Sequence, residues 1–167
     1  MAINLTKADI DLLIREPSGD MRATIASKVG KGFHSHIFTP RERQLAEDIF
    51  RLLLRDTEVR VRKALAVELK SSPDAPHDVI RALAADVTEI SAQILEHSPV
   101  LTDEDLVEII QATQHVVRLV AIASRKQVTG PVCSALLNKK DIAVAKALTH
   151  NKGVEFDDRS FNTLIEH

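Results

Sequence analysis

Few side chains of this 167-residue chain combine the type and the spacing that chemistry requires. The densest basic cluster consists of Arg55, Arg60, Arg62 and Lys63. Arg60 and Lys63 are three residues apart and share one helix face, whereas Arg62 points elsewhere. Cations gathered on one face could attract an anion or an acidic protein surface. The alternative is a solvated helix face whose charge is balanced by Asp56 and Glu58.

Three further motifs each lack a part that their chemistry would need. His34 and His36 form the only close histidine pair, and a metal site would need further ligands, so a loop is the better interpretation. Gly30-Lys31-Gly32 lacks the spacer and the hydroxyl residue of a phosphate-binding loop, and a helix end is expected there. Cys133 lies among aliphatic residues, which predicts a buried thiol. We therefore expect no catalytic residue, no metal site and no cofactor.

The composition argues against nucleic-acid binding. The chain has five Phe and no Trp or Tyr, whereas proteins that bind unpaired bases stack them on aromatic rings. Its net charge of −2 is also unlike that of a duplex-binding protein. Residues 1–70 carry 13 basic and 10 acidic side chains, and residues 71–167 carry 9 and 14. An anionic partner should therefore prefer the N-terminal half.

The sequence also predicts a location. One cysteine cannot form an internal disulfide, and no window holds 18 consecutive apolar residues. The segment Met1–Lys7 lacks the features of a signal peptide. We expect a cytoplasmic protein that does not insert into membranes.

Cap residues mark the starts of helices. Thr39 and Glu42 form a capping box with Pro40 at the first helical position, and apolar residues then repeat at helical spacing. Similar start signals occur at Thr6, Asp20, Asp56, Pro76, Asp86, Thr102, Thr129, Asp141 and Asp157. These signals predict ten or eleven short helices and no strand.

Apolar residues recur in pairs four residues apart. The pairs are Val61 with Leu65, Ile90 with Ile94, Val117 with Ala121, and Ala143 with Ala147, and their starts lie 29, 27 and 26 residues apart. A polar break and a second apolar helix follow each pair, so the repeating unit is a helical hairpin. Single hairpins cannot bury their apolar faces alone and must stack. The pattern predicts an all-α fold, a short α-solenoid, with an irregular helical cap at residues 1–38 and a continuous repeat array at residues 39–167.

The same pattern predicts the core. The residues expected to be buried are Leu45, Ile49, Leu53, Leu65, Ile80, Leu83, Ile94, Ile110, Val117, Val120 and Leu136.

Two stretches resemble known repeat sequences. Residues Asp56–Ala66, with their Asp, Val-Arg and Ala spacing, resemble HEAT-type helical repeats. Residues Ile94–Ile110, followed by Ala121–Arg125, are similar to a bacterial family of HEAT-like repeat proteins catalogued as a domain of unknown function. The resemblance covers roughly residues 45–155. It implies an all-helical repeat fold and supplies no activity, cofactor or catalytic residue.

The Val-Arg element occurs twice, as Val61-Arg62 and Val117-Arg118, while the corresponding residues of the other repeats are Ser91 and Val144. A partly buried arginine needs a fixed partner. We expect both arginines to join one repeat to the next through an acidic side chain or a carbonyl.

The predicted function is that of a non-enzymatic interaction module, a scaffold or adaptor that binds the acidic surface of another protein through the basic cluster. The alternative is an anionic ligand or nucleic acid bound by the same cluster. The apolar C-terminal end, with Phe161, Leu164 and Ile165, predicts self-association.

Overall fold

The computed structural model describes residues 5–15, 18–35 and 37–166. Eleven α-helices lie within these ranges, in agreement with the ten or eleven that the sequence predicts. They are α1 (Lys7–Ile14), α2 (Gly19–His34), α3 (Pro40–Leu53), α4 (Val59–Leu69), α5 (His77–Ala84), α6 (Thr88–His97), α7 (Asp103–Ala112), α8 (Val116–Ala123), α9 (Gly130–Leu137), α10 (Ile142–His150) and α11 (Asp158–Ile165). The described residues form no strand, apart from one isolated parallel bridge between Val128 and Val154. The all-α prediction is confirmed.

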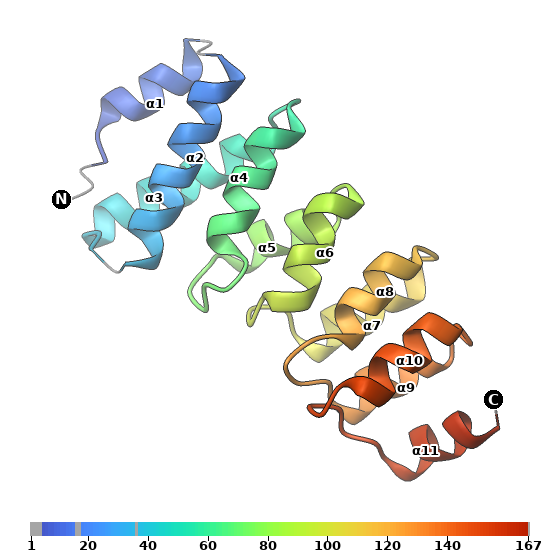
Figure 1. Cartoon of the computed structure of the whole chain (residues 1–167). Helices are drawn as coiled ribbons and strands as arrows, with labels where there is room; N and C mark the ends of the chain where they lie inside the picture. Colours follow the sequence, from blue (N-terminus) through green and yellow to red (C-terminus); the bar gives the residue numbers. More distant parts are fainter. Residues whose placement is uncertain (1–4, 16–17, 36, 167) are drawn as a thin grey trace.

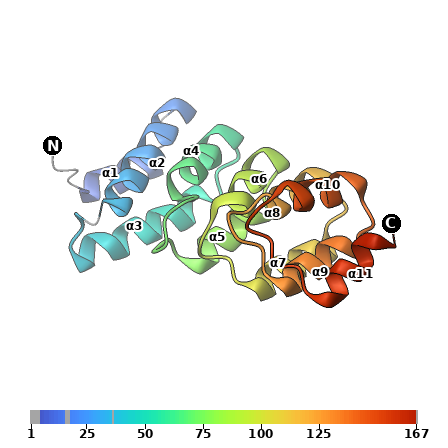
Figure 2. The ribbon, with the colours of Figure 1, turned by 60° about the horizontal axis from the view of Figure 1, so that its bottom comes forward.

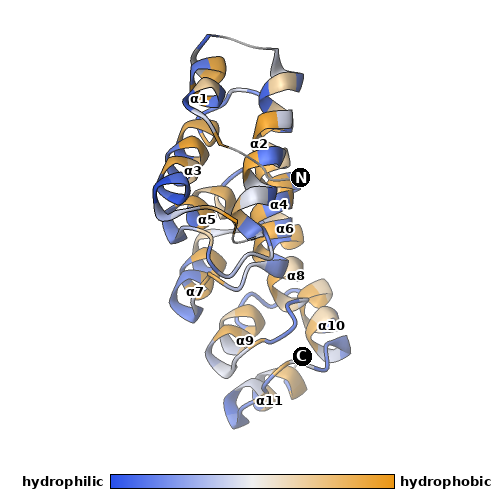
Figure 3. Ribbon diagram, turned by 90° about the vertical axis from the view of Figure 1, so that its left-hand side faces the viewer, coloured by the Kyte–Doolittle hydropathy of each residue, from blue (hydrophilic) through white to orange (hydrophobic). Residues whose placement is uncertain are grey.

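The helices from α2 to α11 form two rows (Figures 1 and 2). In the first row, α2, α4, α6, α8 and α10 pack in sequence order, each on the one before it. The second row contains α3, α5, α7, α9 and α11, and contacts such as α5 with α6 and α9 with α10 join it to the first. Figure 3 shows apolar residues concentrated where the two rows face each other. No helix in the described part of the chain is long and apolar enough to cross a bilayer.

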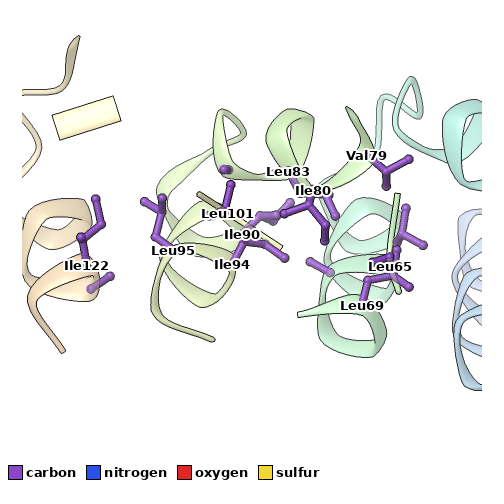
Figure 4. Packing of buried hydrophobic residues seen from close by; sticks show 14 of the residues in the cluster. Leu65, Leu69, Val79, Ile80, Leu83, Ile90, Ile94, Leu95, Leu101 and Ile122 are labelled. Carbon is purple, nitrogen blue, oxygen red and sulfur yellow. The ribbon is translucent and has the colours of Figure 1, made fainter. Parts of the chain in front are cut away.

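The core runs along the junction of the two rows. Figure 4 shows Leu65 and Leu69 of α4, Ile80 of α5 and Ile90 and Ile94 of α6 within it. Eight of the residues predicted to be buried are buried: Ile49, Leu53, Leu65, Ile80, Leu83, Ile94, Ile110 and Leu136. Leu45 and Val120 are half-buried.

Val117 was expected in the core, but the structure contradicts this prediction, since its side chain is 59% exposed. The reason is a shift of one residue between the two Val-Arg dipeptides. Val117 is the second residue of α8 and corresponds to Arg60, the exposed second residue of α4. Arg118 is the third residue of α8 and corresponds to Val61, the buried third residue of α4. The residues of α8 that enter the core are instead Leu119, Ala121, Ile122 and Ala123.

The expected helix end at Gly30-Lys31-Gly32 is also wrong, because α2 continues through these residues to His34. The glycines serve close packing. A Cβ on Gly30 would lie 2.5 Å from Glu68 Cβ on α4, and one on Gly32 would lie 2.3 Å from Phe38 Cζ. α2 packs on α4 as later helices of its row pack on one another, and the proposed division at residue 38 stays a prediction.

Gly153 is required where two turns meet. Its carbonyl accepts a hydrogen bond from Val128 N at 2.9 Å, and a Cβ on Gly153 would lie 1.9 Å from the carbonyl oxygen of Lys126. We expect Gly153→Ala to lower the free energy of unfolding by about 2 kcal/mol, because the backbone at Gly153 or at Lys126 must move to make room for the methyl group. Gly130→Ala is the matched control, since its Cβ would meet no atom closer than 3.5 Å. Urea unfolding followed by circular dichroism measures both, and equal stabilities of the two variants would contradict the prediction.

Candidate interaction site

Arg62 is part of the scaffold. Its guanidinium donates to both carboxylate oxygens of Asp86, from Nε at 2.7 Å and from Nη2 at 2.9 Å. Nη1 donates to the carbonyl oxygen of Asp56 at 2.7 Å. The side chain is only 14% exposed, so this bidentate pair joins α4 firmly to the turn before α6. Arg62 is therefore not available to a partner.

The remaining cations of the predicted cluster lie on the surface. Arg60 pairs with Glu58 and with Asp20, and Lys63 pairs with Glu89 of α6. Arg55 is exposed in the turn after α3. Carboxylates already pair with Arg60 and Lys63, and Glu58 is one of them, which favours the alternative of a solvated helix face with balanced charge. The role of these cations in binding an acidic partner stays a prediction.

Arginines connect successive helices of the first row. Arg22 of α2 donates from Nε to Asp56 at 2.5 Å, and Arg118 of α8 donates to the backbone carbonyl of Asp86. Burial alone would raise the pKa of Asp56 and of Asp86, but hydrogen bonds from Arg22 and Arg62, respectively, help to bring both pKa values below their ordinary range. The expected contacts of Arg62 with an acidic side chain and of Arg118 with a carbonyl are present, and each connects one helix of the first row to the turn before another.

The second row has its own ionic contact. Asp105 is 4% exposed, and its carboxylate lies 2.7 Å from His77 Nε2 and 2.7 Å from Arg81 Nη1, both on α5. Burial raises the pKa of Asp105, but hydrogen bonds from His77 and Thr102 outweigh this effect and lower it. The sequence indicated only a helix-capping role for Asp105. The contact of Asp105 with His77 could not be predicted from local sequence patterns, because 28 residues separate the two.

The turns after α6, α8 and α10 surround a groove of about 720 Å³. Arg125 lines this groove and donates hydrogen bonds to the carbonyl oxygens of Leu95 at 2.6 Å and Ser98 at 2.7 Å. Burial lowers the pKa of Arg125, and Asp103 opposes this shift. The rim carries both signs of charge, with Lys126 and Lys152 as well as acidic side chains. This mixture selects no ligand by charge.

The other motifs singled out in the sequence do not form a site. His34 is the last residue of α2 and His36 lies outside the described residues. Cys133 is fully buried, and burial raises the pKa of its thiol. Across the described residues, no group of three His, Cys, Asp or Glu side chains could hold a metal ion.

Apolar side chains are exposed at the C-terminal end of the two rows. Ile142 of α10 is 87% exposed, and Phe161 and Ile165 of α11 are 55% and 69% exposed. Between these helices lies a second groove of about 720 Å³, here called the C-terminal groove. Its lining residues are Leu137, Lys140, Asp141, Ile142, Ala145, Lys146, Thr149, Thr163 and Leu164. The sequence predicts the apolar residues of α11 at this end, whereas Ile142 carries no signal of exposure there.

The fold and this surface define an all-helical protein with two packed rows and an open apolar end. Residues 90–167 match a family model described as "Uncharacterised protein conserved in bacteria (DUF2336)". Neither the curated proteins nor the solved structures contain a match to the chain. The matched residues include both grooves and most of α6 to α11. Similarity to a bacterial family without an assigned function is thereby confirmed for this part of the chain.

Proposed function

We propose that the protein is a short HEAT-like α-solenoid that acts in the cytoplasm as a non-enzymatic interaction module, a scaffold or adaptor. Sequential packing of α2, α4, α6, α8 and α10 supports the solenoid assignment, because each hairpin then contacts mainly its neighbours. Arg22, Arg62 and Arg118 support it further, since each reaches the turn that precedes another helix of the same row.

The observation that carries the interaction role is the exposure of Ile142, Phe161 and Ile165 at one end of the molecule. Exposed apolar side chains that gather on one surface are typical of protein interaction sites, whereas single exposed ones are not informative. Ile142 lines the C-terminal groove together with Leu164 of α11, and Phe161 and Ile165 are exposed on the same helix as Leu164. A partner that fills the groove could therefore bury apolar side chains of both helices.

Binding of an anionic ligand or nucleic acid through the basic cluster receives less support. Arg62 is committed to Asp86, and of the three surface cations of the cluster Arg60 and Lys63 are paired with carboxylates. An anion would have to displace these carboxylates. We therefore place the partner site at the C-terminal groove.

In-cell photo-crosslinking tests the proposed function. Ile142 is replaced by a photo-reactive benzoylphenylalanine in the full chain, and a second variant carries the same group in place of Val67 on α4. Val67 is the matched control because it is also apolar and 45% exposed. We expect a discrete protein crosslinked from position 142 and none from position 67. The absence of a specific product at position 142 would contradict the proposal.

A further inference from the structure

We propose that the C-terminal groove binds an acidic amphipathic helix of a partner protein. This inference rests on the proposed function and adds the chemistry of the occupant. Helix-in-groove recognition uses a stripe of apolar residues that fills a hydrophobic cleft between helices.

The packing around α10 fits a helical occupant. Val144 and Leu148 of α10 are buried, while Ile142, Ala145 and Thr149 line the groove on the other side. Among the described helices, α4, α6 and α8 each contact a first-row helix before and after them, and α10 contacts only α8 within that row. A helix placed on α10 would therefore repeat the packing of α10 on α8, at the ordinary spacing of about 8 to 10 Å between helix axes.

The charges beside the groove select an acidic helix. Lys140 and Lys146 are exposed, and neither ammonium group forms an ion pair in the described part of the chain. The one carboxylate of the groove, Asp141, already accepts hydrogen bonds from Ala143 N at 2.8 Å and Val144 N at 3.1 Å. Lys140 and Lys146 thus outnumber Asp141 in the groove and, unlike Arg60 and Lys63, have no paired carboxylate in the described part of the chain. Glutamate or aspartate beside the apolar stripe of an incoming helix would supply it.

The same charges disfavour a second copy of the chain as occupant. A symmetric dimer places the same surface on both sides of the interface, so each groove would meet the other groove. Such an interface would contain four lysines, Lys140 and Lys146 of each copy, and only two carboxylates of the grooves, Asp141 of each copy. Like charges brought together in an interface weaken association.

A pair of designed peptides tests the proposal with the full-length chain. Each is about 18 residues long, with leucines at positions i, i+3, i+4 and i+7 repeated along one face. One carries glutamates beside the leucines and the other carries lysines at the same positions. Fluorescence anisotropy of the labelled peptides should give an affinity for the glutamate peptide about tenfold or more above that for the lysine peptide.

Matched variants locate the site. Lys140 has a φ of 54°, a left-handed conformation that asparagine tolerates, so the test variant combines Lys140→Asn with Lys146→Glu. The control combines Lys126→Asn with Lys152→Glu, which makes the same change of charge beside the other groove. The test variant should bind the glutamate peptide about tenfold more weakly, and the control should bind it like the wild type. Ile142→Glu should abolish binding, and circular dichroism verifies that each variant is folded.

Two results would overturn the proposal. One is equal affinity for both peptides, or no affinity for either. The other is sedimentation that shows a wild-type dimer and a monomeric Ile142→Glu variant, because the occupant would then be a second copy. A protein crosslinked from position 142 without any peptide binding would refute the acidic helix and leave the interaction module standing. If neither peptide binding nor a crosslinked protein is observed, both the acidic helix and the interaction module are refuted.

Discussion

Replacement of Arg62 by alanine should lower the free energy of unfolding by about 3 kcal/mol, the lower part of the range for breaking a buried ion pair. The side chains of Arg62 and Asp86 are 14% and 11% exposed, so the truncation leaves a carboxylate largely removed from water. It also leaves the carbonyl oxygen of Asp56 without the 2.7 Å hydrogen bond that Nη1 donates. Urea unfolding followed by circular dichroism at 222 nm, a wavelength that reports helix content, measures the difference.

Arg60→Ala is the matched control for this experiment. Arg60 lies two residues away on α4 and also pairs with carboxylates, but its side chain is 53% exposed. Solvent screens an exposed pair, so Arg60→Ala should change stability far less than Arg62→Ala. Similar losses in the two variants would mean that burial does not determine the contribution of these arginines.

The effect of Arg62→Ala should depend on pH. Burial raises the pKa of Asp86, and the hydrogen bond from Arg62 helps to lower it below its ordinary value. A carboxyl group whose pKa is lower in the folded state stabilises the fold above its unfolded-state pKa, which is about 3.9. That contribution disappears as the pH falls through the folded-state pKa. The stability difference between wild type and Arg62→Ala should therefore be largest near neutral pH and should shrink below about pH 4.

Arg125→Ala should cost about 3 kcal/mol, since two carbonyl groups lose their hydrogen-bond donors and each unsatisfied group costs about 1 to 3 kcal/mol. The guanidinium bonds to Leu95 and Ser98 connect the turn after α8 to the end of α6. Asn151 makes the same kind of contact after α10, the next helix of the first row. Its Nδ2 donates to the carbonyl oxygens of Ala123 and Arg125, both at 2.7 Å. Loss of Arg125 therefore disturbs a chain of contacts between turns.

The neighbouring Lys126 provides the control for Arg125. Lys126 is exposed beside the same groove, and Lys126→Ala removes a cation of similar size. Its unfolding midpoint in urea should stay close to that of the wild type. An Arg125→Ala variant as stable as Lys126→Ala would show that water replaces the guanidinium at no cost.

Interactions between residues close in sequence could be predicted from the sequence, whereas contacts between distant residues could not. Capping boxes at Thr6, Thr39 and Thr102 join residues three positions apart, and all three form in the structure. Most helix starts were therefore readable from the sequence, whereas the start of α8 after His115 carries no such signal. Most core positions were readable too, because a helix that packs on one side repeats its apolar residues every three to four positions.

The sequence alone determined the helical class, the number of helices to within one and most of the core, because these depend on neighbours within one or two turns. Tertiary structure decided that α2 continues through Gly30, that Val117 faces solvent and that Arg62 belongs to the scaffold. These outcomes depend on how one helix lies against the next, and the contact of Arg62 with Asp86 spans 24 residues. Tertiary structure also revealed the C-terminal groove. Ile142 is an aliphatic residue at the start of a helix, and only the structure shows that its side chain is 87% exposed while Val144 and Leu148 of the same helix are buried.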